Sequence, residues 1–213
     1  GSPLLVNSLN ITNKVKQQLN SETFQVELGM RYGQPSIDSV ITKMQEQGVR
    51  KLLVLPLYPQ YSATTTASTF DAVADSFSKK RLLPELRFVN HYHDLSLYID
   101  ALVESIEDFW RDNGRADKLI LSYHGIPKIY WESGDPYICE CYKTSRLLAE
   151  RLGLAEDEVM TCFQSRFGKQ EWVKPYTDAT LKSLPSQGVK KVQIMCPGFS
   201  ADCLETLEEI SDQ

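Results

Sequence analysis

The sequence lacks the features that mark several large classes of protein. Its 23 lysine and arginine residues are outnumbered by 28 aspartate and glutamate residues, which gives a formal net charge of -5. Because phosphate recognition requires a basic patch, this balance excludes nucleic acid as an expected partner. No run approaches the roughly 18 apolar residues of a membrane-spanning helix. We therefore predict no transmembrane segment, which leaves peripheral membrane contact open.

Targeting and disulfide signals are also absent. The chain begins Gly1-Ser2-Pro3-Leu4, with no charged region followed by an apolar one, so we predict no signal peptide. The 5 cysteines are odd in number and irregularly spaced. This pattern is typical of buried thiols in a reducing compartment rather than of a disulfide framework. A cytoplasmic protein is expected.

Helical and strand patterns alternate along the chain. Apolar residues recur at helical spacing in four segments, and short apolar runs indicate a strand after each of them. The predicted helices span residues 36–47, 97–110, 144–152 and 176–184, and the predicted strands span 52–57, 119–121, 159–163 and 192–195. Strands separated by helices imply an α/β fold with a mostly parallel sheet.

A weak internal repeat divides the chain into two parts. Arg31-Tyr32-Gly33 and the helix, strand and Tyr61-Ser62-Ala63 that follow it are echoed by a series from Arg166-Phe167-Gly168 to Phe199-Ser200-Ala201. We interpret this as two similar α/β halves, residues 1–94 and 95–213, whose loops line one cleft. Chance similarity between ordinary βα units is the alternative.

His124 is the first candidate for chemistry. The apolar run of residues 119–121 precedes it and indicates a short buried strand, and Gly125 and Pro127 follow it and indicate a turn. The imidazole is therefore expected at the carboxyl end of a strand, where open parallel sheets bind ligands. The alternative is a structural histidine hydrogen-bonded at the strand end.

An acidic segment near the end of the chain is the second candidate. A turn at Pro197-Gly198 precedes a helix predicted to begin near Asp202, which would place four acids on one side: Glu205, Glu208, Glu209 and Asp212. Asp202 and Glu205 fit a capping box, but like charges at these spacings repel one another. Handling a cation would explain the stripe, since histidine with glutamate is a plausible ligand set for Fe²⁺.

Other residues suggest a planar ligand with polar substituents. Tyr61 and Ser62 place hydroxyls beside aromatic rings after a strand, whereas we interpret residues 64–66 as a helix start. Trp172 lies in a polar segment without an evident core role, which favours stacking on a ligand. Arg31 and Arg166 could each bind a carboxylate through a bidentate fork or be plain surface residues.

Five separated motifs, in order, closely resemble the ferrochelatase family. They are Leu55-Pro56-Leu57-Tyr58-Pro59-Gln60-Tyr61-Ser62, Leu121-Ser122-Tyr123-His124-Gly125-Ile126-Pro127, Gly134-Asp135-Pro136-Tyr137, Thr161-Cys162-Phe163-Gln164-Ser165-Arg166-Phe167-Gly168 and Cys196-Pro197-Gly198-Phe199-Ser200-Ala201-Asp202-Cys203-Leu204-Glu205-Thr206. The resemblance, strongest to bacterial enzymes, implies two Rossmann-like halves around a porphyrin cleft. It also implies insertion of Fe²⁺ into protoporphyrin IX, the last step of haem biosynthesis, by a lyase that forms metal-nitrogen bonds.

The resemblance also implies roles for matched residues. His124 corresponds to the family's invariant active-site histidine and Glu205 to the glutamate facing it, and both are expected to bind the metal. Seven further residues match positions that the family places around the macrocycle: Arg31, Tyr32, Tyr61, Ser62, Gln164, Trp172 and Phe199. Cys203 replaces a histidine of some relatives, so we assign it no metal. Compared with the family, the chain is expected to be a fragment lacking both ends.

Several alternatives stay open at this point. A related chelatase could use cobalt or another metal, and a fragment could bind porphyrin without turnover. Some ferrochelatases carry an iron-sulfur cluster, but a [2Fe-2S] site needs four thiolates, and Cys139 and Cys141 form only a C-x-C pair. No cofactor is expected to be obligatory, because iron is a substrate. Nothing in the sequence specifies an oligomeric state.

Overall fold

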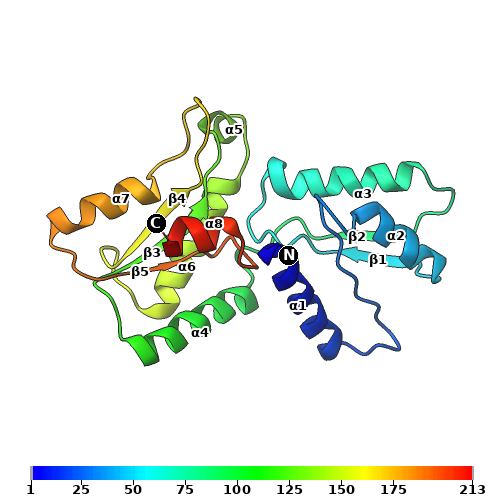
Figure 1. Ribbon diagram of the computed structural model, residues 1–213, viewed down its shortest axis with the longest axis horizontal. Coiled ribbons are helices and arrows are strands. Elements are labelled where there is room, and N and C mark those ends of the chain that lie inside the picture. Colours follow the sequence, from blue (N-terminus) through cyan, green and yellow to red (C-terminus); the bar gives the residue numbers. More distant parts are fainter. Residues whose placement is uncertain (1, 213) are drawn as a thin grey trace. The chain divides into compact units, whose positions relative to one another are not determined.

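The computed structural model describes residues 2–212, except the side chains of residues 211 and 212, and divides into two compact units (Figure 1). The first unit comprises the chain up to Leu57, Ala63–Asn90 and Ala201–Leu204. The second comprises Tyr58–Ser62, His91–Ser200 and the chain from Glu205 onward. Each unit contains a parallel sheet flanked by helices, so the predicted α/β class is confirmed.

The first unit is built on a two-stranded parallel sheet. Strand β1 (Lys51–Val54) pairs with β2 (Glu85–Phe88). The apolar stripe of α2 (Ile37–Glu46) buries Ile41 and Met44 against Leu52 of β1 and Val73 of α3 (Ser68–Ser78). Helix α2 ends before Gly48, whose φ of 89° suits only glycine well. The helical segments of this unit are α1 (Pro3–Gln18), α2 (Ile37–Glu46), the π-helix η1 (Ala63–Ala67) and α3 (Ser68–Ser78).

The second unit has a three-stranded parallel sheet between helices. Strand β3 (Lys118–His124) lies between β4 (Val159–Gln164) and β5 (Val192–Met195). Its helical segments are α4 (Ser96–Asn113), α5 (Lys128–Glu132), α6 (Tyr137–Leu152), α7 (Thr177–Ser183), the 3₁₀-helix η2 (Leu184–Gln187), α8 (Leu204–Thr206) and the π-helix η3 (Leu207–Asp212). Figure 1 shows α4 and α6 on one side of this sheet and α7 on the other.

Alternating side chains of β3 explain why helices cover both faces. Leu119, Leu121 and Tyr123 pack with the buried residues of α4 and α6, while Ile120 packs with Cys162 and η2 on the opposite face. Successive side chains of a strand point to opposite faces, so β3, which is buried at every position from Leu119 to Tyr123, must be covered on both. Each fully buried aliphatic side chain contributes roughly 1.5–3 kcal/mol, which makes β3 the centre of this unit.

The predicted elements agree with the structure in most places. All four predicted helices and all four predicted strands are present, although β1 ends at Val54 rather than at Leu57 and α6 begins at Tyr137 rather than at residue 144. The helix start interpreted at residues 64–66 lies in η1, which continues into α3, whereas helices α1 and α5 and strand β2 were not predicted. The helix expected to begin near Asp202 begins at Leu204, but the expected α-helical spacing was wrong, because only Leu204–Thr206 is α-helical and a π-helix follows. Within residues 2–212, none of the helices combines the length and apolar character that crossing a bilayer requires.

Candidate active site

His124 lies at the carboxyl edge of the sheet of the second unit. It is the last residue of β3, and Gln164, the last residue of β4, pairs with it in the ladder. Strand β5 ends at Met195 opposite Leu121, so the loop that follows β5 starts at the same edge. All three strands are parallel, and this edge is therefore where the open α/β sheet is expected to bind a ligand.

The hydrogen bond of His124 defines its tautomer. Nδ1 lies 2.7 Å from the carbonyl oxygen of Gly125, and a carbonyl oxygen can only accept a hydrogen bond. Nδ1 therefore carries the proton in this bond, which leaves a lone pair on Nε2 of the neutral ring. A half-buried imidazole in this tautomer can accept a proton or bind a metal ion through Nε2.

Two aromatic rings lie next to the imidazole. The ring centroids of Trp172 and Phe199 are 6.4 Å and 6.5 Å from that of His124. The expectation that Trp172 has no core role was wrong. Its side chain is 6% exposed, packs over Gly125 and donates from Nε1 to the backbone oxygen of Phe167 at 2.9 Å. The local sequence is polar, but the indole fills the space that glycine leaves beside the strand end.

Gln164 connects the histidine edge with Glu205. The amide is buried, with Oε1 accepting from Ser122 Oγ at 2.6 Å and Nε2 donating to the backbone oxygen of Glu205 at 2.6 Å. Because Gln164 pairs with His124 in the ladder, this bond holds the backbone of Glu205 at the same edge. The Glu205 side chain is partly exposed. The two residues are brought to one edge from positions 81 apart in the chain.

The predicted acidic stripe is only partly as expected. Glu209 Oε2 accepts from Ser165 Oγ at 2.6 Å, whereas Glu208 is exposed to solvent. The segment follows π-helical rather than α-helical spacing; its wider turn changes which acids share a side. The side chain of Asp212 lies outside the described residues.

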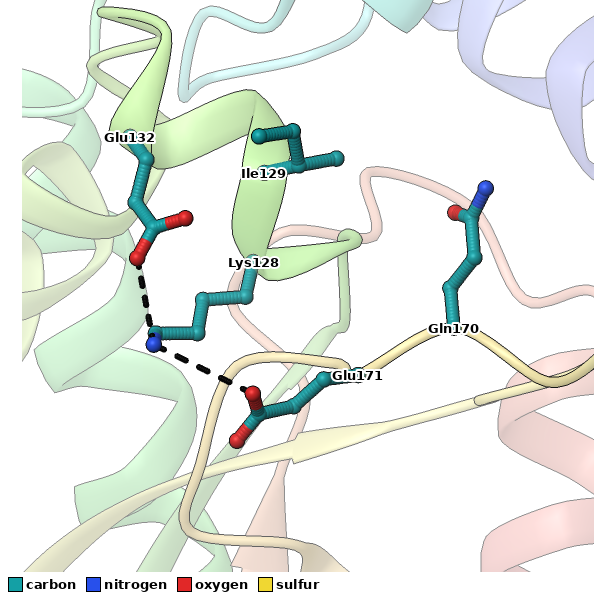
Figure 2. A pocket seen from close by; sticks show the side chains of 5 residues that line it. All are labelled: Lys128, Ile129, Glu132, Gln170 and Glu171. Carbon is teal, nitrogen blue, oxygen red and sulfur yellow. Dashed lines mark ion pairs between the residues drawn. The ribbon is translucent and has the colours of Figure 1, made fainter.

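Two pockets open on the second unit. One, of about 390 Å³, is lined by Arg166, Phe167, Gly168, Gln170, Trp172 and Tyr176, and its volume falls within the range of small-molecule sites. Arg166 pairs with Asp178 at 2.9 Å and lies over the ring of Tyr176. The other, of about 270 Å³, surrounds Lys128, which pairs with Glu132 and Glu171 (Figure 2). The first pocket includes Trp172 and so adjoins the histidine edge.

Comparison with known proteins shows the family to which the chain belongs. The sequence model of the family described as Ferrochelatase matches residues 1–213. The chain belongs to the ferrochelatase family. It is 60% identical to the ferrochelatase of Idiomarina loihiensis over 216 residues and 58% identical to that of Marinobacter nauticus over 217 residues, in each case across 100% of this chain. The resemblance stated from the motifs is confirmed.

The relatives are longer than this chain. The chain spans about 59% of the Idiomarina loihiensis ferrochelatase and 58% of the one from Marinobacter nauticus. Among solved structures, the one titled SirB from Bacillus subtilis with Fe3+ matches with a TM-score of 0.64 at 15% identity, covering 88% of this chain and 68% of that one. This likeness supports the fold alone.

The remaining positions suggested by the ferrochelatase resemblance lie in both units. In the second unit, Ser62 is 1% exposed and donates to Asp135 Oδ2 at 2.9 Å, and Tyr61 is partly exposed. In the first unit, Arg31 donates from Nε to Ser68, with its guanidinium 4.6 Å from the ring centroid of Tyr32. Tyr32 is 73% exposed. Contact of these residues with porphyrin stays a prediction.

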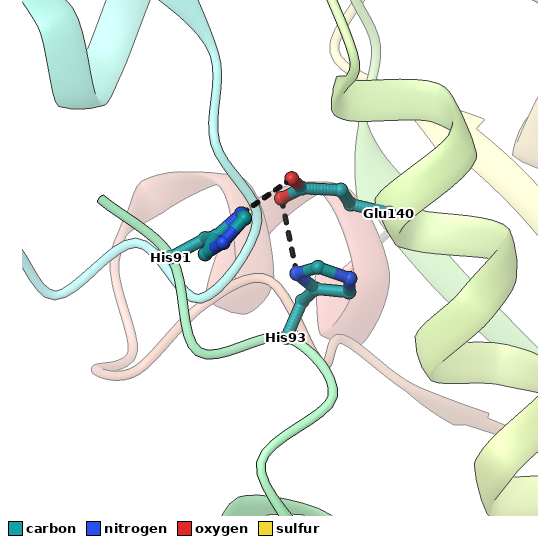
Figure 3. A group of neighbouring side chains, drawn as sticks. All are labelled: His91, His93 and Glu140. Atoms are coloured by element: carbon teal, nitrogen blue, oxygen red, sulfur yellow. Dashed lines mark hydrogen bonds and ion pairs between the residues drawn. The ribbon is translucent and has the colours of Figure 1, made fainter. Parts of the chain in front are cut away.

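The sequence analysis missed one cluster of ligand-type side chains. His91, His93 and Glu140 place three such groups within 4.8 Å of one another in the second unit (Figure 3). The H-x-H spacing of residues 91 and 93 was the only local signal, because Glu140 is distant in sequence. Within residues 2–212, no cysteine belongs to such a cluster. Cys141, Cys162 and Cys203 are buried, Cys196 is partly exposed and Cys139 is exposed.

Proposed function

We propose that the complete gene product inserts ferrous iron into protoporphyrin IX to form protohaem, the last step of haem biosynthesis. The observation that carries the proposal is His124 at the carboxyl edge of a parallel sheet, with Nδ1 bonded to a backbone oxygen so that Nε2 is the nitrogen left to accept a proton or bind iron. Two aromatic rings lie beside it, in a chain of the ferrochelatase family. Iron is a substrate in this reaction, so no resident cofactor enters the proposal.

The reaction makes demands that His124 and Glu205 can meet. Free-base porphyrin carries two inward N–H protons, and Fe²⁺ replaces both, so the product complex keeps the overall charge balance. We assign to His124 Nε2 the acceptance of pyrrole protons or ligation of the iron on one face of the macrocycle. Glu205 is proposed to act on the opposite face of the macrocycle. Glu208, Glu209 and Asp212 pass ions or protons between the site and solvent.

Binding of the macrocycle relies on flat apolar groups and a few polar ones. Trp172 and Phe199 offer stacking surface near the imidazole. Binding energy gained at the periphery of the porphyrin can offset the strain of bending it, which exposes a nitrogen lone pair to the metal. The full proposed set is Arg31, Tyr32, Tyr61, Ser62, Gln164, Trp172 and Phe199, drawn from the two proposed halves, residues 1–94 and 95–213.

Gln164 and Ser62 have a second proposed role as positioning residues. Both side chains are nearly fully buried and already hydrogen-bonded within the protein. Gln164 is bonded to the backbone of Glu205, so its replacement by leucine would release that carbonyl group. We expect Gln164→Leu to lower the rate of insertion more than it weakens porphyrin binding.

An anaerobic assay with the complete gene product tests the function. Protoporphyrin IX is mixed with Fe²⁺, Co²⁺ or Zn²⁺ in turn, and insertion is followed by the loss of free-base porphyrin fluorescence and by the product's absorbance. Insertion of Fe²⁺ supports the proposal. Insertion of Co²⁺ but not Fe²⁺ would instead indicate a cobalt chelatase. Tight porphyrin binding without insertion of any metal would indicate a binding protein and overturn the enzymatic proposal.

A further inference from the structure

Three side chains of the second unit that have no assigned role in iron insertion converge on one point. His91 and His93 come from the segment between β2 and α4, and Glu140 lies in the first turn of α6 (Figure 3). The carboxylate lies between the two rings, with Oε1 2.6 Å from His91 Nδ1 and Oε2 3.2 Å from His93 Nδ1. None of the three belongs to the set proposed for porphyrin or for iron insertion.

Burial makes this arrangement unusual. His93 is 5% exposed and Glu140 is 7% exposed. Although His93 Nδ1 lies near the carboxylate, it has no partner with hydrogen-bond geometry among the described residues. Buried polar atoms are nearly always satisfied, so an unsatisfied ring nitrogen that faces a carboxylate points to a missing bonding partner. The side chain of His91 is 51% exposed and leaves a route from solvent.

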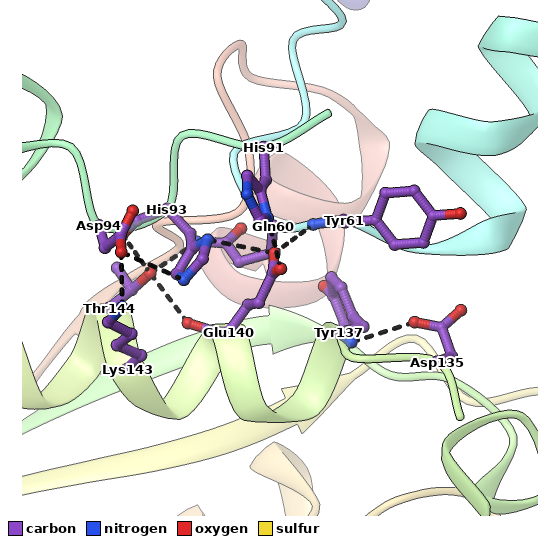
Figure 4. A network of polar contacts seen from close by, with 10 residues as sticks. All are labelled: Gln60, Tyr61, His91, His93, Asp94, Asp135, Tyr137, Glu140, Lys143 and Thr144. Atoms are coloured by element: carbon purple, nitrogen blue, oxygen red, sulfur yellow. Dashed lines mark hydrogen bonds and ion pairs between the residues drawn. The ribbon is translucent and has the colours of Figure 1, made fainter. Parts of the chain in front are cut away.

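The surrounding contacts hold the three groups in place (Figure 4). The backbone N–H of Tyr61 donates to Glu140 Oε2 at 2.6 Å. Thr144 Oγ1 donates to the backbone oxygen of His93 at 2.8 Å. The other ring nitrogen of His93 lies 4.0 Å from Asp94 Oδ2, a carboxylate that also pairs with Lys143 at 2.5 Å. At 4.0 Å the contact between His93 and Asp94 is too long for a hydrogen bond, so the carboxylate of Glu140 is held by Tyr61 and the backbone of His93 by Thr144.

The geometry points to a site for a divalent metal of the Zn²⁺ or Fe²⁺ class, bound by His91, His93 and Glu140, and we propose it as a second metal site of this chain. Two imidazole nitrogens and one carboxylate oxygen suit borderline divalent ions better than Mg²⁺ or Ca²⁺. Bonds of about 2.0–2.1 Å in tetrahedral geometry place ligand atoms about 3.3 Å apart. The 3.2 Å separation between His93 Nδ1 and Glu140 Oε2 matches this spacing.

A bound ion joins separate segments of the unit. Its binding releases to solvent the proton that His91 shares with Glu140. The ion then bonds to the unsatisfied nitrogen of His93 and leaves a fourth position for water, as in three-ligand zinc sites. The ion thus connects the segment before α4 to α6. Because only the folded chain presents the three ligands together, binding raises the unfolding temperature of the protein. The site shares no residue with His124 and Glu205, so it does not rest on the proposed function.

Zinc titration of the complete gene product tests the site. A His124→Ala background removes binding at the proposed insertion site, and affinity is measured in competition with a chromophoric chelator. We expect a single Zn²⁺ to bind and to raise the unfolding temperature. His91→Gln and His93→Gln should each weaken binding on the order of 10–100-fold or more, the size of loss seen even for outer partners of a metal site. Asn90, the exposed residue next to His91, provides the control. Asn90→Gln should leave both the Zn²⁺ affinity and the unfolding temperature unchanged.

Two results of the zinc titration would overturn the proposed metal site. Absence of Zn²⁺ binding in the His124→Ala protein overturns the proposal, and so does binding that His91→Gln and His93→Gln leave unchanged. If His93→Gln fails to fold, the Zn²⁺ affinity of His91→Gln alone tests the proposal. The His91 side chain is half exposed, so replacing it leaves the core intact. Co²⁺ absorption offers a second readout: its ligand-field bands should appear in the parent protein and disappear in His91→Gln.

Discussion

Gly125→Ala tests the packing that supports the histidine edge. A Cβ at Gly125 would lie 3.1 Å from the backbone oxygen of Gln164 and 3.1 Å from Trp172 Cε3, and both distances are shorter than nine in ten Cβ contacts in folded proteins. The oxygen also accepts the Gly125 N–H at 2.8 Å, and the indole is fixed by its own hydrogen bond. Neither neighbour can move without disturbing the end of β3 or of β4.

The expected loss follows from these contacts. Overpacking costs about 1–3 kcal/mol, and the lower entropy of the unfolded alanine chain offsets about 0.4–1 kcal/mol of it. The net loss is at most about 2.6 kcal/mol, and its midpoint of about 1.3 kcal/mol lowers the unfolding temperature by roughly 3–5 °C for a protein of this size. Thermal unfolding followed by circular dichroism measures it.

A matched glycine supplies the control. A Cβ at Gly29 would meet only ordinary contacts, at 3.4 Å from atoms of Ile37, so Gly29→Ala should leave the unfolding temperature unchanged or slightly raised. Equal unfolding temperatures for Gly125→Ala and Gly29→Ala would refute the claim that Trp172 and the β4 backbone pack tightly around this glycine.

Three further predictions concern the second unit. Hydrogen bonds from two backbone N–H groups just before β5 lower the pKa of Asp117. Its charged form therefore stabilises the fold above the ordinary pKa of 3.8. At pH 7 Asp117→Asn should have a lower unfolding temperature than the parent protein, and the difference should shrink as the pH falls below this value. A difference that stays constant with pH would contradict this. Leu148→Ala removes a fully buried side chain and should cost about 2–5 kcal/mol in urea unfolding, so a loss below that range would mean that α6 packs loosely. Burial raises the pKa of Cys141, so iodoacetamide should modify exposed Cys139 first, and equal rates in mass spectra would contradict the burial of Cys141.

Strong periodicity explains which elements were predictable. The apolar stripe of α2 buries Ile41 and Met44, and the helix lies between a serine N-cap and a glycine. The apolar spacing, the N-cap and the glycine all indicate the same helix. In α1 the apolar side chains Leu4, Val6 and Leu9 stay largely exposed, so its sequence has no clear buried stripe. Strand β2 has only four residues, two of them charged, and is held by pairing with β1 rather than by its own pattern.

The candidate site was predictable where one residue carried the signal. His124 ended an apolar run before a turn, and the position of a strand end follows directly from that pattern. Trp172 was misread because its burial depends on Gly125, which is far away in the sequence. His93 and Glu140 meet only through the tertiary fold, which no local periodicity encodes. Contacts between residues that are distant in the sequence could therefore not be predicted from the sequence.

The most direct test of the account is the effect of His124→Ala on the complete gene product. Insertion of Fe²⁺ into protoporphyrin IX and binding of the porphyrin alone are measured side by side, the first by product absorbance and the second by fluorescence titration. Nε2 of His124 is the proposed proton acceptor or iron ligand, whereas stacking depends on Trp172 and Phe199. The account predicts loss of insertion with porphyrin binding retained. Insertion at the parent rate would contradict it.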